Sequence, residues 1–149
     1  MKKMIVLAVL LFATVASATT LTVKLGDEFV FGDICLERMG PIQVGVAVGV
    51  DYFMESANTD DIDIDVGDSY IGPIIKFHVL PKDSDVVLCA EYAPMFVTDQ
   101  LHRSASEIIG ATLSYKGFGI SYQYFLDAYK TGPSPKSDLW MLSWTGGKF

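Results

Sequence analysis

Residues 42–54 read IQVGVAVGVDYFM, and this stretch has the clearest strand pattern of the chain. Every second residue from Ile42 to Met54 is apolar, whereas the residues between them are mostly small or polar. Because side chains on a β-strand point alternately to opposite faces, the pattern predicts a strand with one apolar face and one small-residue face. At about 3.3 Å per residue, the stretch is as long as a bilayer-crossing strand, which needs about 9 to 11 residues.

The chain starts with a segment typical of a secretory signal. Lys2 and Lys3 precede an apolar run over residues 4–15, which ends in Ala-Ser-Ala at 16–18. The run is shorter than the roughly 20 residues that a membrane-spanning helix requires. We therefore expect cleavage after Ala18 and a single domain over residues 19–149.

The expected mature domain is acidic. Residues 1–18 hold two of the eleven basic residues and none of the eighteen acidic ones, which leaves nine basic residues against eighteen acidic ones and a net charge of −9. This charge argues against binding to nucleic acid and against a polybasic contact with a membrane surface.

The same alternation recurs along the chain. It predicts strands over 69–80, 85–97, 107–115, 118–127 and 137–149, with a tight turn at Lys116-Gly117. The connections at 38–41, 81–84 and 116–117 are short, and those at 56–68, 98–106 and 128–136 are long. Transmembrane barrels show this asymmetry between their two ends. Residues 19–37 must then hold two further strands, with a turn at Gly26-Asp27 or at Gly32-Asp33.

These expectations define the fold class as all-β, an antiparallel up-and-down transmembrane β-barrel of eight strands. A soluble barrel with its apolar faces turned inward also fits the alternation. A soluble surface carries about 25 to 35% charged residues, whereas the non-apolar faces here are mainly glycine, serine, threonine and glutamine. Such faces suit the narrow bore of an eight-stranded barrel, which side chains just fill. Charge therefore favours the transmembrane arrangement.

The carboxyl end adds a motif. The chain stops at Phe149, after Trp144 and Gly146-Gly147, and this resembles the terminal aromatic signal by which bacterial outer-membrane barrels are recognised for assembly. With its leader and strand pattern, the chain resembles a small eight-stranded bacterial outer-membrane protein. The resemblance implies a location in the bacterial outer membrane, with lipids, lipopolysaccharide and the barrel-assembly machinery as partners.

The phase of the last strand conflicts with that signal. If Phe149 faces outward, Leu139 and Met141 do so too, because side chains alternate. The residues between them would then face the bore: Trp140, Leu142 and Trp144. A bulge near 146–147 would reset the phase.

Seven polar residues are expected to face the bore and to form a hydrogen-bonded network. They are Lys24, Glu37, Asp51, Lys76, His78, Glu91 and Gln123. Charges in a low-dielectric lumen need partners, so one interpretation is a salt-bridge network that plugs the barrel. The alternative is a gated ion path, which the pairs could open by exchanging partners. Cys35 and Cys89 face the same bore from strands that are not neighbours, so we expect two free, buried thiols.

Two prolines, Pro73 and Pro94, fall inside predicted strands, where proline cannot donate to the ladder. The turn at 81–84 pairs these strands so that both prolines lie at a similar height near the outer rim. This predicts a local gap in hydrogen bonding. The gap is either a rim bulge or a lateral opening for a lipid tail, as in barrels similar to lipid A acyltransferases.

The acidic stretch at 56–68 has a pattern that relates to metal binding. Asp61, Asp63 and Asp65 have the alternate spacing of calcium loops, since hard cations take several carboxylate oxygens. Val66, however, stands where an EF-hand loop needs glycine, so a solvated acidic loop is the alternative.

A second pattern relates to catalysis. His102 and Ser104 have a His-x-Ser spacing similar to that of outer-membrane lipid A deacylases, although no other part of that motif is present. The alternative is a polar loop in which Arg103 meets lipid phosphate.

The sequence therefore favours a non-enzymatic outer-membrane barrel with a plugged polar lumen, whose outer loops serve adhesion, envelope stability or partner binding. The alternatives are a lipid A-modifying enzyme and a narrow channel. No cofactor is expected, because the chain has no phosphate-cradling glycine loop and no zinc-ligand spacing.

Overall fold

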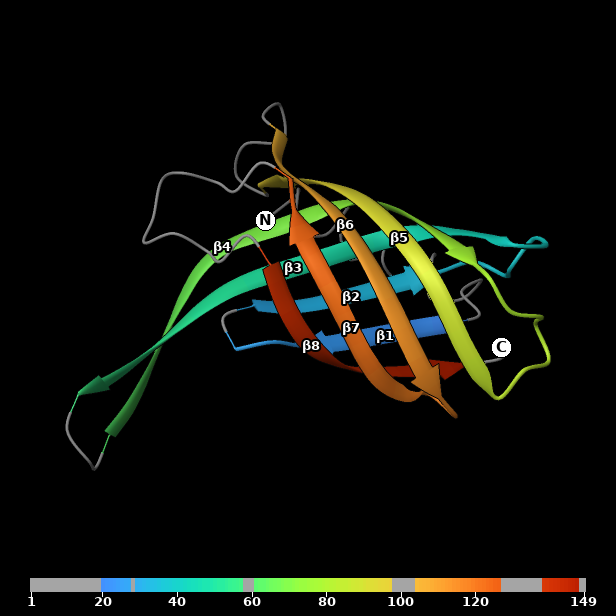
Figure 1. Ribbon diagram of the computed structural model, residues 1–149. Coiled ribbons are helices and arrows are strands. Elements are labelled where there is room, and N and C mark those ends of the chain that lie inside the picture. The colour runs from blue at the N-terminus through green and yellow to red at the C-terminus, as the bar shows by residue number, and fades with distance from the viewer. Residues whose placement is uncertain (1–19, 28, 58–60, 98–103, 127–137, 148–149) are drawn as a thin grey trace.

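A computed structural model of the chain describes residues 20–27, 29–57, 61–97, 104–126 and 138–147, without the side chains of 52–57, 61–67, 97 and 104–106. Its strands follow one another around a closed antiparallel barrel, in which β1 pairs with β8 (Figure 1). They are β1 (Thr20–Leu25), β2 (Phe29–Cys35), β3 (Ile42–Ala57), β4 (Asp61–His78), β5 (Val86–Val97), β6 (Ser104–Tyr115), β7 (Phe118–Phe125) and β8 (Asp138–Gly147). The predicted all-β, eight-stranded fold is thus confirmed. The described residues contain no helix that is long and apolar enough to cross a membrane.

The amino-terminal hairpin resolves the choice of turn that the sequence left open. The chain turns at Gly26-Asp27, so that Thr20 pairs with Cys35 and Leu25 pairs with Val30. Glycine 32 lies inside β2 instead, opposite Val23. Both strands are short, with six and seven residues.

The tight turn at Lys116-Gly117 is confirmed as well. Lys116 has φ 49° and Gly117 has φ 89°, the positive values that two-residue hairpin turns of type I′ require. The turn fixes the register of β6 against β7, with Tyr115 opposite Phe118. This register places Ser121 and Gln123 in the bore and turns Ile120 outward.

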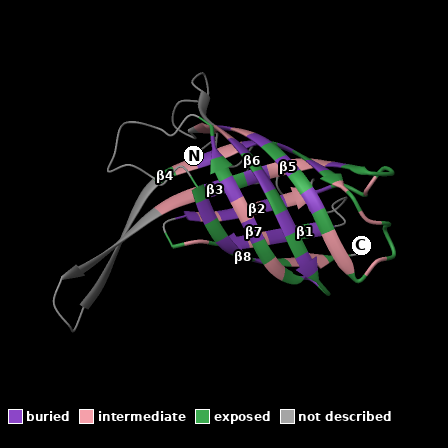
Figure 2. Cartoon of the chain, viewed as in Figure 1, coloured by how far each residue is buried: buried purple, intermediate pink, exposed green. Residues whose placement is uncertain are grey.

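Burial alternates along the strands (Figure 2). Large apolar side chains are exposed on the outer faces, and the buried side chains include both polar and apolar ones. Strand β8 has the opposite phase from the one that an outward Phe149 requires. Leu139 and Met141 are buried, whereas Trp140 and Leu142 are 67% and 69% exposed. The register with β1 runs from Leu25↔Leu142 to Thr20↔Gly147 without a shift, so no bulge near 146–147 resets the phase. Phe149 lies outside the described residues.

The prediction of a loop over 56–68 is wrong. Strands β3 and β4 continue through this stretch and remain paired up to Ala57↔Asp61, so they form a ribbon that projects beyond the barrel (Figure 1). The physical reason is the strict alternation of aspartate with isoleucine or valine over 61–66, which is a strand pattern whatever its charge. The expected connection at 98–106 is also too long, because β6 already begins at Ser104.

The gap predicted at the two prolines is confirmed. Strands β4 and β5 pair at Tyr70↔Val97 and Ile71↔Phe96 and again from Ile75↔Tyr92, with no pairs between. In this register Pro73 faces Pro94, so neither residue can supply the N–H that the ladder needs. The backbones still approach closely, since a Cβ placed on Gly72 would lie 1.9 Å from the carbonyl oxygen of Pro94. The interruption is therefore one of hydrogen bonding and not an aperture.

We predict that Gly72→Ala destabilises the barrel by about 1–3 kcal/mol, because the added methyl group overlaps a backbone oxygen that cannot rotate away. The matched control is Gly32→Ala, whose Cβ would meet its nearest atoms at 3.6 and 3.7 Å, an ordinary contact. Urea unfolding of both variants in detergent micelles measures the difference. Equal midpoints for the two variants would contradict the close approach at the proline gap.

Candidate functional site

The bore of the barrel is the candidate functional site, and it has two chemically different halves. Polar residues lie toward the end with the short turns between β2 and β3, β4 and β5, and β6 and β7. Apolar residues lie toward the end from which the β3–β4 ribbon projects. The order of the inward-facing residues along each strand creates this division: β4, for example, places His78 and Lys76 at the first end and Ile74 and Tyr70 nearer the second.

The first ion pair of the bore joins Lys24 on β1 to Glu91 on β5. Lys24 Nζ lies 2.5 Å from Glu91 Oε1, and both side chains are almost fully buried. The same oxygen accepts hydrogen bonds from Thr112 Oγ1 at 2.7 Å and from Gln123 Nε2 at 2.8 Å. Glu91 is therefore the centre of a network that spans β1, β5, β6 and β7. The hydrogen bonds and the opposite charge offset the loss of hydration of its carboxylate.

The second ion pair joins Lys76 on β4 to Asp33 on β2. Lys76 Nζ lies 2.6 Å from Asp33 Oδ1 and donates a further hydrogen bond to Thr22 Oγ1 at 3.0 Å. Cys35 Sγ donates to the same aspartate oxygen at 3.2 Å. The two ion pairs thus cross the bore at about the same height and connect four of the strands, β1 to β5 and β2 to β4.

Nearer the short turns, hydroxyl and amide groups fill the bore. Gln43 donates to Thr20 Oγ1 and to the carbonyl oxygen of Leu36, both at 2.9 Å, and Gln43 Oε1 lies 2.9 Å from His78 Nε2. A cavity of about 30 Å³ remains among these groups. Since a water molecule needs at least about 10–15 Å³ of such volume, the cavity holds only a few waters.

An apolar plug closes the other half of the bore. Its members include Phe29, Phe31, Tyr70, Ile74, Met95, Ile108, Phe125, Leu139 and Met141, all of them buried. The ring of Phe29 lies at its centre, 5.5 Å from the ring of Phe125 and 5.9 Å from that of Tyr70, measured between centroids. Lys24 Nζ lies 4.9 Å from the centroid of Phe31, so the plug rests directly on the first ion pair.

The seven residues expected in a lumen network do not all come together. Four of them, Lys24, Lys76, Glu91 and Gln123, form the two ion pairs and their hydrogen bonds. His78 joins Gln43 nearer the short turns, and Asp51 accepts a hydrogen bond from Tyr70 Oη at 2.6 Å near the other end.

Glu37 was expected in the bore, and this expectation is wrong. Strand β2 ends at Cys35, so strand parity no longer applies to Glu37. Its carboxylate pairs with Lys82 at 2.8 Å, and the two side chains are 69% and 43% exposed. Asp33 takes the place of the second acidic group. Its parity with Cys35 signals this position once the turn is placed at Gly26-Asp27.

The two cysteines are free and buried, as predicted. Cys35 lies on β2 and Cys89 on β5, which are not neighbours in the barrel. Both thiols therefore belong to the packing of the bore.

The remaining site expectations have no site geometry in the described part of the chain. Asp61, Asp63 and Asp65 occupy alternate positions of β4 and not a loop, and their side chains are not described. Among the described residues, no group of acidic, histidine and cysteine side chains could hold a metal ion. His102 lies outside the described residues, and Ser104 is the first residue of β6.

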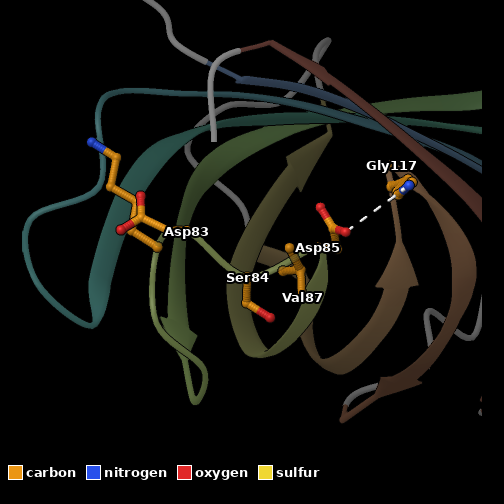
Figure 3. Close-up of a pocket in the computed structure, with 7 residues that line it drawn as sticks. Asp83, Ser84, Asp85, Val87 and Gly117 are labelled. Carbon is orange, nitrogen blue, oxygen red and sulfur yellow. Dashed lines mark ion pairs between the residues drawn. The ribbon is translucent and has the colours of Figure 1, made fainter.

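A hollow of about 170 Å³ lies outside the bore, beside the turns that follow β4 and β6 (Figure 3). Its lining includes Lys116 and Asp85, whose charged atoms lie 4.0 Å apart. Both side chains are mostly exposed, so water screens the pair. Because its charged residues are all exposed, the hollow is a weaker candidate than the bore.

No protein-family model, no curated protein and no solved structure matches the chain.

We predict that Glu91→Gln lowers the free energy of unfolding by about 3–5 kcal/mol, because it leaves the buried Lys24 without a counter-charge. The matched control is Glu37→Gln, which removes an exposed partner of Lys82 and is expected to change stability by less than about 1 kcal/mol. The double variant Lys24→Met/Glu91→Gln should recover part of the loss. Equal effects of the two single glutamine variants would contradict the buried pair.

Proposed function

We propose that the protein is a small outer-membrane barrel with a closed bore, which holds a projecting β-ribbon and its neighbouring connections outside the membrane for binding a partner. The role of the barrel in this proposal is that of an anchor, and neither catalysis nor transport is part of it.

The arrangement of apolar and charged side chains carries the proposal. Large apolar side chains are exposed on the outer faces of seven of the strands, among them Leu25, Val48, Ile75, Phe77, Leu88, Ile109, Leu113, Phe118, Ile120, Trp140 and Leu142. The outward side chains of β2, Val30 and Ile34, are half-buried. Buried Lys24, Asp33, Lys76 and Glu91 lie inside. This is the reverse of the order in water-soluble proteins, in which charged residues are almost never fully buried. A contiguous apolar wall of this extent marks contact with lipid or with another protein.

Exposed aromatic residues support the same placement. Phe77, Tyr115, Phe118 and Trp144 lie on the outer wall close to the short turns. Aromatic girdles at the two interfaces are a general feature of outer-membrane barrels, because an amphipathic ring suits the boundary between acyl chains and headgroups. These four residues would define the interface at the end of the short turns, which in such barrels faces the periplasm.

The closed bore favours an anchor over a channel. The apolar plug fills the ribbon end of the bore, and the remaining cavity of about 30 Å³ lies on the other side of the ion pairs. An ion that crossed the barrel would have to pass the packed rings of Phe29 and Phe125, which offer no polar groups to replace its hydration shell.

We expect the folded protein to show no stepwise conductance when it is inserted into planar lipid bilayers. Truncation of the plug in Phe29→Ala/Phe125→Ala is expected to produce small, resolvable openings, since it removes the two rings at the centre of the bore. Insertion itself is checked by heat-modifiable mobility in gel electrophoresis of the same proteoliposomes. Large and stable openings of the unmodified protein would overturn the closed-bore proposal in favour of a channel.

A further inference from the structure

The β3–β4 ribbon outside the barrel has a regular register. After one irregularity between Val50 and Tyr52, the pairs run without interruption from Tyr52↔Val66 to Ala57↔Asp61. In an antiparallel pair, residues that face each other share one face of the sheet, and the faces alternate along each strand. The register therefore assigns every residue of the ribbon to one of two faces.

The two faces differ in chemistry. One face takes Glu55, Asp61, Asp63 and Asp65 together with Phe53 and Ala57, and Glu55 is directly opposite Asp63. The other face takes Tyr52, Met54, Ile62, Ile64 and Val66 together with Ser56. The acidic residues of these pairs thus all belong to one face, and most of them are on β4.

Strands β3 and β4 pair with their outer neighbours, β2 and β5, only as far as the rim of the barrel. Strand β2 pairs with β3 as far as Phe29↔Asp51, and β5 pairs with β4 as far as Tyr70↔Val97. Beyond these pairs, none of the described strands lies along residues 61–69 of β4 on the side away from β3. An edge strand presents a row of backbone donors and acceptors, which is a template for the addition of another strand.

We propose that the outer part of β4 binds an extended, basic segment of a partner protein, which adds to the ribbon as a third strand. Backbone hydrogen bonds along 61–69 would supply the affinity. Lysine or arginine residues at alternate positions of the partner would lie opposite Asp61, Asp63 and Asp65 and fix the register. This inference rests on the proposed function, because it names the class of partner that the displayed ribbon takes.

Charge decides between this occupant and a second copy of the chain. If two copies paired through the same edge, aspartates of one β4 would meet aspartates of the other, and like charges directly opposite are destabilising. A basic strand would instead place positive charges opposite these aspartates.

The test uses the full folded protein in micelles of an uncharged detergent and a fluorescein-labelled peptide of alternating lysine and threonine. Fluorescence anisotropy is expected to show saturable binding that weakens with salt. The triple variant Asp61→Asn/Asp63→Asn/Asp65→Asn is expected to bind at least about tenfold more weakly. The matched control, Glu37→Gln/Asp83→Asn/Asp85→Asn, removes the same number of charges near the short turns and is expected to leave the affinity unchanged.

A second pair of probes separates strand addition from simple charge attraction. Two peptides of the same sequence are N-methylated at alternate residues, one at the lysines and one at the threonines. Only the peptide whose methyl groups point toward β4 is expected to lose binding, by at least about tenfold, because alternate N–H groups of an added strand face opposite sides.

Four results would overturn the inference. Equal weakening by the two triple variants would show non-specific attraction, and equal binding of both methylated peptides would exclude strand addition. Ribbon-dependent self-association without peptide would identify a second copy as the occupant. Heat-modifiable mobility and bilayer insertion are measured on the same samples, so a barrel that inserts and ignores the peptide contradicts this inference and leaves the proposed function intact.

Discussion

Two lysines and two carboxylates are buried inside the bore, and the need to pair these charges constrains which face of each of their strands points inward. Lys24, Lys76, Asp33 and Glu91 come from four different strands, and each ion pair joins strands that are not neighbours. An unpaired charge at these positions would be very costly, so the pairs fix which face of each strand points inward. Because side chains alternate, the apolar residues of the same strands must then point outward.

The division of the bore into two halves follows from the same pairs. The ion pairs and their hydrogen-bonding partners occupy the middle of the barrel, and Phe31 packs against Lys24 on the ribbon side. Apolar side chains beyond that level pack as in the core of a soluble protein. The bore therefore combines a specific polar network with an ordinary hydrophobic core.

Much of this arrangement could be predicted from the sequence, because period-two alternation is a local signal. It predicts the faces of the described strand residues within 42–51, 69–78, 86–96, 107–115 and 118–125. It also predicts the inward positions of Lys76, Glu91 and Gln123 and the facing prolines in β4 and β5. The alternation predicted the wrong face where the sequence did not fix the position of a turn or the end of a strand. Asp33 was missed because two turns were open in the first hairpin, and Glu37 was misplaced because parity was carried past the end of β2.

Two further differences have other physical causes. The phase of β8 was assigned from the terminal Phe149, whereas the structure sets it by pairing with β1, in which Lys24 faces Ser143. The acidic stretch was interpreted as a loop from its charge, although alternation over 61–66 favours a strand. The apolar plug could not be predicted, because the meeting of Phe29, Tyr70 and Phe125 depends on the stagger of strands that are distant in sequence.

The proposed function requires that the outer wall of the barrel contacts acyl chains. Trp140 and Trp144 are the only tryptophans of the chain, and both face outward from β8. The most direct measurement is therefore the quenching of tryptophan fluorescence by lipids that carry bromine on their acyl chains, with the protein folded in liposomes. Strong quenching is expected in the wild type and in each single variant, Trp140→Phe and Trp144→Phe. Fluorescence that is unaffected by the brominated lipids would rule out contact between the outer wall and acyl chains.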